Sequence, residues 1–294
     1  MASNDRLLRW LFLAPTLILL ALLLYYPMIG TVIESFYQTS FINPEPKFVG
    51  WAVYESVLSS RDFSEVVWNS IAWTLGVVIL QNLFGFFAAL LLNQGLPGQG
   101  LVRAVVLLPW ILPGVVAAIL WRFMYDPQLG LINSLLIRTG LLEDNAAWLA
   151  DSSTAMAAVI VAAVWKGFPF STLIYLAALQ TVDREQIEAA IIDGAGAVRR
   201  LIHVTLPAIR EVIVVNVVLT LILTFNYFDM VWVLTRGGPQ NSTHIFPTKI
   251  FETGFGQLRF GEAATYGVVS ILVLAILVSF YVLAQRRPGD GRTP

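Results

Sequence analysis

Long apolar runs alternate with short polar segments along the chain, and these runs are long enough to cross a membrane. A transmembrane helix needs about 20 consecutive, mostly apolar residues, because its backbone must satisfy its own hydrogen bonds inside the bilayer. Six runs have this character, at about 10–33, 70–92, 104–125, 155–179, 212–234 and 263–285. We therefore expect an all-α polytopic membrane protein in which residues 1–294 form a single transmembrane domain with six helices.

The first run could in principle be a cleaved signal peptide. It is longer than the apolar core of a signal peptide, and no small-x-small cleavage pattern follows it. We expect it to be retained as a helix.

Composition agrees with a membrane protein and excludes several kinds of chemistry. The chain is 57% hydrophobic and 13% charged, with a mean hydropathy of +0.74, whereas a soluble domain carries about 25% charged residues. It has no cysteine and only two histidines, His203 and His244, so disulfides, thiol catalysis and a metal site are not expected. The net charge of −1 gives no nucleic-acid footprint. No Gly-Lys-Ser/Thr phosphate loop is found, so the chain does not bind ATP by that device.

The positions of Lys and Arg predict the orientation, because these residues are enriched in cytoplasmic loops. With both termini inside, ten Lys and Arg residues fall on the cytoplasmic side and seven outside. The inside residues are Arg6, Arg9, Arg103, Arg184, Arg199, Arg200, Arg210, Arg286, Arg287 and Arg292, and the outside residues are Lys47, Arg61, Arg122, Arg138, Arg236, Lys249 and Arg259. The inside charges also abut the ends of the runs. We therefore expect both termini, and the segment 183–207, in the cytoplasm.

The cytoplasmic segment 183–207 is charged and rich in small residues. Residues 184–192 favour a short helix, and Asp183 can cap its start. Gly194 and Gly196 then permit a sharp bend, a second helical stretch reaches residue 206, and Pro207 limits its continuation. The residues alone leave two interpretations open: a compact knob for a partner protein, or a surface loop whose arginines meet lipid phosphates.

The segment reads "EAAIIDGAGAVRRLIHVTLP" and resembles the EAA loop of ABC importer permeases, whose pattern is E-A-A-x-x-D-G-A followed, after a spacer, by I-x-L-P. The matching residues are Glu188, Ala189, Ala190, Asp193, Gly194, Ala195, Leu206 and Pro207. The stretches "APTLILLALLLYYP", "FVGWAVYESVL", "LLPWILPGVVAAILWRFMYDPQLGLIN" and "FNYFDMVWVLTRGGPQNST" are similar to the sugar-type permeases of that family.

The resemblance implies a type I ABC importer permease fold and a multi-pass location in a bacterial or archaeal cytoplasmic membrane. Its implied partners are a second homologous permease, two cytoplasmic ABC ATPase subunits that use ATP and Mg, an extracytoplasmic solute-binding protein and the lipid bilayer. This chain would then bind no cofactor and would not itself be an enzyme. The EAA loop would be the coupling helix, with Glu188 as a charged contact to the ATPase and Gly194 as the bend that seats it. The external loop 235–262 would face the binding protein.

A polar stripe on the fifth run predicts where a solute passes. Asn216, Thr220, Thr224 and Tyr227 share one face of a helix, with Leu223 beside them. Helix packing is the alternative for Thr220 taken alone. The resemblance adds Lys166, Gly167 and Phe170 to this substrate pathway. Asn226 and Asp229 lie off the stripe, and Trp110 is interpreted as a packing or interface residue.

The function implied by the resemblance is import of a sugar or sugar-like solute, and the residues leave its identity open. Lys166 also admits an anionic solute, although its amine can instead meet Asp229 or a helix end. A stand-alone secondary transporter or channel is the alternative class, but the chain shows no inverted repeat and few intramembrane charges. An intramembrane enzyme would need paired acids or a Ser/His arrangement within the membrane, which the sequence does not show.

Overall fold

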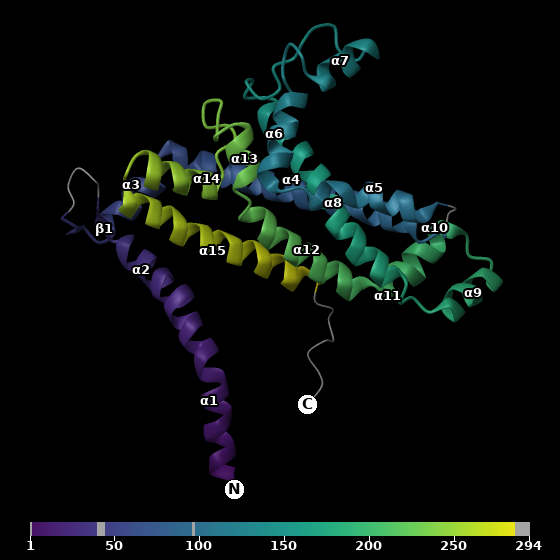
Figure 1. Ribbon diagram of the computed structural model, residues 1–294, viewed down its shortest axis with the longest axis horizontal. Helices are drawn as coiled ribbons and strands as arrows, with labels where there is room; N and C mark the ends of the chain where they lie inside the picture. The colour runs from purple at the N-terminus through teal and green to yellow at the C-terminus, as the bar shows by residue number, and fades with distance from the viewer. Residues whose placement is uncertain (1, 40–44, 96–97, 286–294) are drawn as a thin grey trace. The chain divides into compact units, whose positions relative to one another are not determined.

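The computed structural model describes residues 2–39, 45–95 and 98–285, with side chains from Trp10 onward, and is mostly helical (Figure 1). The α-helices are α1 (Ala2–Leu20), α2 (Tyr26–Glu34), α3 (Ala52–Leu58), α4 (Arg61–Leu92), α5 (Gln99–Ile111), α6 (Gly114–Met124), α7 (Leu131–Arg138), α8 (Ala155–Leu179), α9 (Arg184–Ile192), α10 (Ala197–Arg200), α11 (Leu206–Ala208), α12 (Arg210–Phe225), α13 (Asp229–Leu234), α14 (Phe246–Phe251) and α15 (Phe260–Gln285). Three π-helical turns cover Ala21–Tyr25, Leu201–Thr205 and Glu252–Gly256, and β1 (Tyr37–Gln38) pairs antiparallel with β2 (Lys47–Phe48). The chain forms two compact units: the described residues up to Ser64 with Lys249–Val273, and Glu65–Thr248 with the described residues from Leu274.

The first unit combines a long exposed helix with a small packed cap. α1, the π-helical turn and α2 run on without a break, and the span Trp10–Glu34 is apolar and unburied, as expected of a helix that faces lipid. In the cap, Tyr54 of α3 is buried and its hydroxyl lies 2.7 Å from Ser35 Oγ. Gly261, at the start of α15, approaches β1 so closely that a Cβ there would lie 1.9 Å from the Tyr37 carbonyl oxygen. Glycine is therefore required at this contact.

The second unit is organised around α8, which is rich in alanine. Ala158, Ala162 and Ala163 are buried in one cluster with Trp73 and Trp121, because small side chains allow neighbouring helices to approach closely. α5 packs along α8, and α6 packs against α13 (Figure 1). This arrangement brings α4, α5, α6, α8, α12 and α13 around one region.

Gly85 lies where α4 closely approaches the backbone of α8. A Cβ on Gly85 would lie 2.6 Å from Ser171 Cβ and 3.0 Å from the Phe168 carbonyl oxygen, both on α8. Gly76, further up α4, would meet only the flexible end of Ile160, with Cδ1 at 2.9 Å. The α4–α8 spacing is therefore fixed by backbone contact at Gly85 and only by a side chain at Gly76.

Among the described residues, four helices are long and apolar enough to span a membrane: Trp10–Glu34, Arg61–Leu92, Ala155–Leu179 and Phe260–Gln285. The expected span 104–125 is not one helix, because α5 and α6 meet at a bend of 97°. Pro113 lies in this break; its ring removes one backbone donor and disfavours a helical conformation in the residue before it. The predicted segment is therefore formed by two helices that meet at a sharp bend, and whether the pair makes one span stays a prediction.

The expected span 212–234 is also interrupted. α12 begins at Arg210 after a bend of 72° from Ala197–Ala208, ends at Phe225, and is followed by α13 from Asp229. Tyr227 lies between the two helices and is not on the same helical face as Thr220. The even spacing of the stripe predicted a longer helix than the chain forms.

Candidate functional site

A cavity of about 420 Å³ opens in the second unit. Its lining residues are Val77 and Gln81 of α4, Trp110 of α5, Gly114 of α6, Ala163, Lys166, Gly167 and Phe170 of α8, Thr220, Leu223 and Thr224 of α12, and Tyr227 and Asp229. Seven of the eight residues predicted for the substrate pathway thus line one cavity. The exception is Asn216.

The two helix breaks shape this cavity. Because α5 stops at Ile111, the first residue of α6 faces the cavity, and a Cβ on Gly114 would lie 3.1 Å from Asp229 Oδ2 and 3.3 Å from the Tyr227 hydroxyl. The amino end of a helix carries a partial positive charge that attracts carboxylates. Asp229 is therefore well placed at the start of α6, and the small size of Gly114 leaves room for both polar groups.

The cavity carries one basic and one acidic side chain, an aromatic wall and several hydroxyls. Lys166 and Asp229 both line it, from α8 and α13. The rings of Trp110 and Phe170 lie 6.0 Å apart with an interplanar angle of 32°. Within the described residues no group of three or more His, Asp or Glu could hold a metal ion. The lining thus offers apolar ring faces next to hydrogen-bonding groups.

The side chain of Gln81 leaves no room for a Cβ at Gly167. A Cβ on Gly167 would lie 2.3 Å from Gln81 Oε1, and Gln81 is buried with its Nε2 donating to Ser171 Oγ at 3.3 Å. A glycine at this position therefore allows the Gln81 side-chain amide of α4 to pack directly against α8.

Asn216 lies beneath the cavity, in a buried polar cluster. It is fully buried, and its Nδ2 donates to Asn82 Oδ1 at 2.7 Å. Tyr175 also donates to Asn82 Oδ1, at 2.5 Å. In this structure Asn216 acts as an interhelical contact.

Six lining residues were missed or assigned elsewhere on sequence grounds: Val77, Gln81, Trp110, Gly114, Ala163 and Asp229. On sequence grounds Trp110 was assigned to packing and Asp229 was placed off the stripe, and the structure places both in the cavity lining. Pro113 was the available signal, since a break there exposes the residues on each side of it. Nothing in the spacing of α4 indicates that Gln81 faces the cavity.

The segment 183–207 forms the helix, cap and bend that its sequence predicts. α9 covers Arg184–Ile192, and Asp183 caps it by accepting a hydrogen bond from the Glu185 backbone N–H at 2.9 Å. Gly194 follows with a φ of +76°, in the left-handed region that favours glycine. The Ala195 N–H closes the turn onto the Ala190 carbonyl at 2.9 Å.

Arg200 stabilises the bend from the other side. Its Nη1 donates to the Ala195 carbonyl at 2.7 Å, so this arginine is engaged within the protein. After the bend the chain continues through α10, the π-helical turn and α11, which contains Leu206 and Pro207, and then reaches Ile209. Ile209 is 1% exposed and packs in a cluster with Tyr175 and Leu179 of α8. The segment is thereby anchored to the helix that lines the cavity.

The same segment exposes apolar side chains. Ile191, Ile192, Val198 and Ile202 are 52%, 86%, 69% and 50% exposed. Exposed apolar groups that gather in one place mark interaction surfaces more often than isolated ones do.

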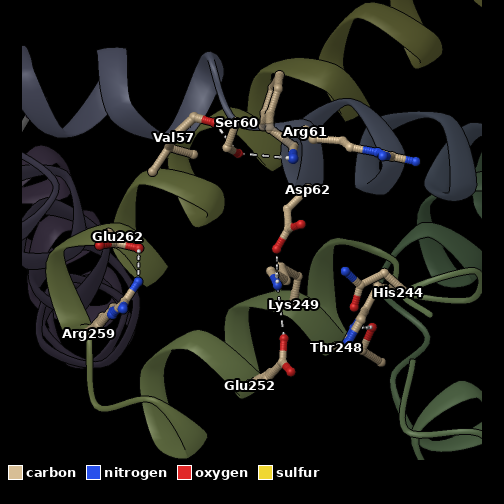
Figure 2. A network of polar contacts seen from close by, with 12 residues as sticks. Val57, Ser60, Arg61, Asp62, His244, Thr248, Lys249, Glu252, Arg259 and Glu262 are labelled. Carbon is tan, nitrogen blue, oxygen red and sulfur yellow. Dashed lines mark hydrogen bonds and ion pairs between the residues drawn. The ribbon is translucent and has the colours of Figure 1, made fainter. Parts of the chain in front are cut away.

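A compact ion cluster lies in the first unit, centred on Lys249, which is outside the membrane spans. Lys249 is buried, and its Nζ donates to Asp62 Oδ2 and Glu252 Oε2, each at 3.0 Å (Figure 2). Burial of the ammonium opposes its ionisation, but the hydrogen bonds to Glu252 and Asp62 outweigh this and raise the pKa of Lys249 above its usual value. Arg259 pairs with Glu262 nearby at 3.5 Å.

A family model described as the inner membrane component of binding-protein-dependent transport systems matches residues 81–288. This match covers more than half of the chain and includes the 183–207 segment and every cavity-lining residue except Val77. The chain belongs to this family.

The sequence is similar to those of named transport permeases over nearly its whole length. The trehalose/maltose transport system permease protein MalF of Thermococcus litoralis is 34% identical over 95% of this chain and 93% of its own length. The sulfoquinovosyl glycerol transport system permease protein SmoG of Agrobacterium fabrum is 33% identical over 95% of this chain and 90% of its own. A chain of a bacterial ABC transporter involved in the import of the acidic polysaccharide alginate shares the fold, with a TM-score of 0.83 at 24% identity over 98% of each chain.

Proposed function

We propose that this chain is the permease subunit of an ABC importer and passes a sugar or sugar-like solute through the cavity between α4, α8 and α12. The observation that carries the proposal is the cavity itself, in which hydroxyls, an amide and two aromatic rings converge. Sugars suit such a lining, because aromatic rings can cover their apolar faces while polar side chains bond their hydroxyl groups. The named solutes of the two permease relatives both contain sugar units.

The ATPase side of the proposal rests on the cytoplasmic segment. α9 and the bend at Gly194 present a short helix with exposed Ile191 and Ile192, which favours a docked protein over lipid headgroups. Two ATPase subunits outside this chain would supply ATP hydrolysis with Mg, and Glu188, exposed on α9, would be a charged contact. Movement of the segment would reach α8 through buried Ile209.

The remaining assembly is proposed from the family. A second homologous permease would complete the pathway, and an extracytoplasmic solute-binding protein would deliver the solute near the loop 235–262. We further propose six spans, in which α5 and α6 together form the third and α12 and α13 together form the fifth, and both termini in the cytoplasm of a bacterial or archaeal cell. Arg286, Arg287 and Arg292, which contribute to this orientation, lie outside the described residues.

The test combines a binding screen with transport. The matching binding protein is screened by thermal shift against maltose, trehalose, sulfoquinovosyl glycerol, glycerol 3-phosphate and alginate oligosaccharides, and the assembled importer is then assayed in vesicles for uptake of the sugar that binds. We expect ATP-dependent uptake that is lost in Glu188→Lys and Gly194→Pro while both variants still insert. ATP-independent uptake by the chain alone would overturn the proposal.

A further inference from the structure

The amide of Asn82 is fully engaged beneath the cavity. Its Nδ2 donates to the Val78 carbonyl at 2.8 Å and to Thr220 Oγ1 at 3.0 Å. Its Oδ1 accepts from Tyr175 at 2.5 Å and from Asn216 at 2.7 Å. An Asn side chain has two donors and two acceptor lone pairs, and all four are used here. One residue of α4 thus fixes polar groups on α8 and α12.

Among these partners, Thr220 also lines the cavity, and its hydroxyl has little freedom left. Its proton is donated to the Asn216 carbonyl at 2.8 Å, with the Val217 carbonyl at 3.1 Å. One of its two lone pairs receives the Asn82 amide. These bonds leave one acceptor lone pair of the hydroxyl unused, and its proton is directed to backbone carbonyls of its own helix.

We propose that Asn82 is a positioning residue for solute recognition: it holds the Thr220 hydroxyl as a fixed hydrogen-bond acceptor for a donor group of the solute. This inference rests on the proposed function, since it takes the cavity as the solute pathway. Asn82 itself does not line the cavity, so it acts through Thr220. A sugar hydroxyl supplies the required donor, and an acceptor-only group such as a sulfonate or phosphate oxygen at this point does not.

The competing role for Asn82 is helix packing, in which the amide joins α4, α8 and α12 without affecting the solute. The two roles differ in how mutations combine. If Asn82 acts through Thr220, removing either side chain removes the same interaction with the solute, and the double variant shows no further loss. If Asn82 only packs helices, its effect is independent of Thr220.

The experiment is a double-mutant cycle on the assembled importer in vesicles, with Asn82→Leu, Thr220→Val and both together. The probe is the radiolabelled panel sugar with the highest wild-type uptake, with trehalose tested first. We expect each single variant to raise KM about five-fold, the equivalent of one hydrogen bond of about 1 kcal/mol. The double variant should stay within about two-fold of Thr220→Val, with maximal uptake little changed throughout. Where Asn82→Leu does not assemble, Asn82→Ala replaces it in the cycle.

Asn133 provides a matched control. It is also a side-chain amide with several partners: its Nδ2 donates to the Pro127 and Ala146 carbonyls, and its Oδ1 accepts from Trp148 Nε1. It is not among the residues that line the cavity. Asn133→Leu should lower the stability of the complex and leave KM unchanged.

The outcomes separate the two proposals. An unchanged KM in Thr220→Val overturns the proposed pathway through this cavity. A raised KM in Thr220→Val, with an unchanged or strictly additive effect of Asn82→Leu, overturns the positioning role alone. A raised KM in Asn133→Leu comparable to that in Asn82→Leu also overturns it.

Discussion

Alanine at Gly194 tests whether the bend after α9 is required for coupling, and Gly196 offers a control two residues away. Gly194 has a φ of +76°, whereas Gly196 has a φ of −65° and a ψ of 166°, which any residue adopts. Apart from the glycine itself and its two chain neighbours, no heavy atom of the described residues lies within 4 Å of a Cβ built on either glycine. Substitution at each position therefore acts through the backbone alone.

The magnitudes follow from these backbone angles. A left-handed conformation costs an L-residue about 1–2 kcal/mol, so Gly194→Ala should reduce the population of the observed bend roughly ten-fold. Gly196→Ala carries no such strain and should stabilise the segment by about 0.4–1 kcal/mol, by restricting the unfolded chain. Gly194→Asn should recover part of the loss, because Asn tolerates the left-handed region.

The assay is titration of the ATPase subunit onto the permease complex in vesicles, with hydrogen exchange at the Ala195 amide as the structural readout. That amide is bonded to the Ala190 carbonyl in the observed bend. We expect Gly194→Ala to weaken ATPase binding about ten-fold and to speed this exchange, and Gly196→Ala to do neither. Equal effects of the two substitutions would refute the reasoning, as would normal binding by Gly194→Ala with faster exchange.

Three further predictions concern packing, charge and capping. Gly85→Ala should destabilise the complex by about 1–3 kcal/mol through overpacking against the α8 backbone. Gly76→Ala, which meets only a flexible side chain, should destabilise it clearly less. Denaturant titration in mixed micelles compares the two variants, and equal losses of stability would contradict the backbone contact assigned to Gly85. Lys249→Met should cost about 1.5–3 kcal/mol, near the lower end because Asp62 is 48% exposed. Because the pKa of Lys249 is raised in the folded protein, its contribution to stability is complete below the unfolded pKa of about 10.4 and is lost as the pH rises through the folded pKa. A stability difference between Lys249→Met and wild type that shrinks already between about pH 7 and 9 would contradict this. Asp183→Ala should lower the stability of α9 by about 1 kcal/mol, seen as faster exchange of its first amides, with no change expected at the cavity.

The sequence was most informative where structure is set locally. Asp183 before a run of helix-favouring residues predicted both the start of α9 and its cap, and the structure has both. The bend at Gly194 follows from a residue that alone adopts its backbone angle without strain. Neither feature depends on distant parts of the chain.

Features set by the packing of helices were predicted less well. Hydropathy counts apolar residues and is insensitive to whether a helix is continuous. It therefore did not predict the size of the bend between α5 and α6, which is 97°, or the end of α12 at Phe225. The cavity brings Asp229 and Trp110 together with α8 only because of these breaks. Gln81 likewise reaches the cavity through the close approach of α4 to α8, which sequence spacing on α4 does not encode.

The break at Pro113 has a consequence for attempts to redirect this transporter to another cargo. The first N–H groups of α6 have no carbonyl of their own helix to bond, and Gly114 places this end of the helix at the cavity wall. Main-chain groups are the same whatever side chain is attached, so exchanging lining residues between relatives leaves that part of the recognition surface untouched. A library built only from side-chain substitutions would therefore change the cavity walls and leave this backbone element constant. Moving the proline along the chain would shift the helix break itself and would change the recognition surface more.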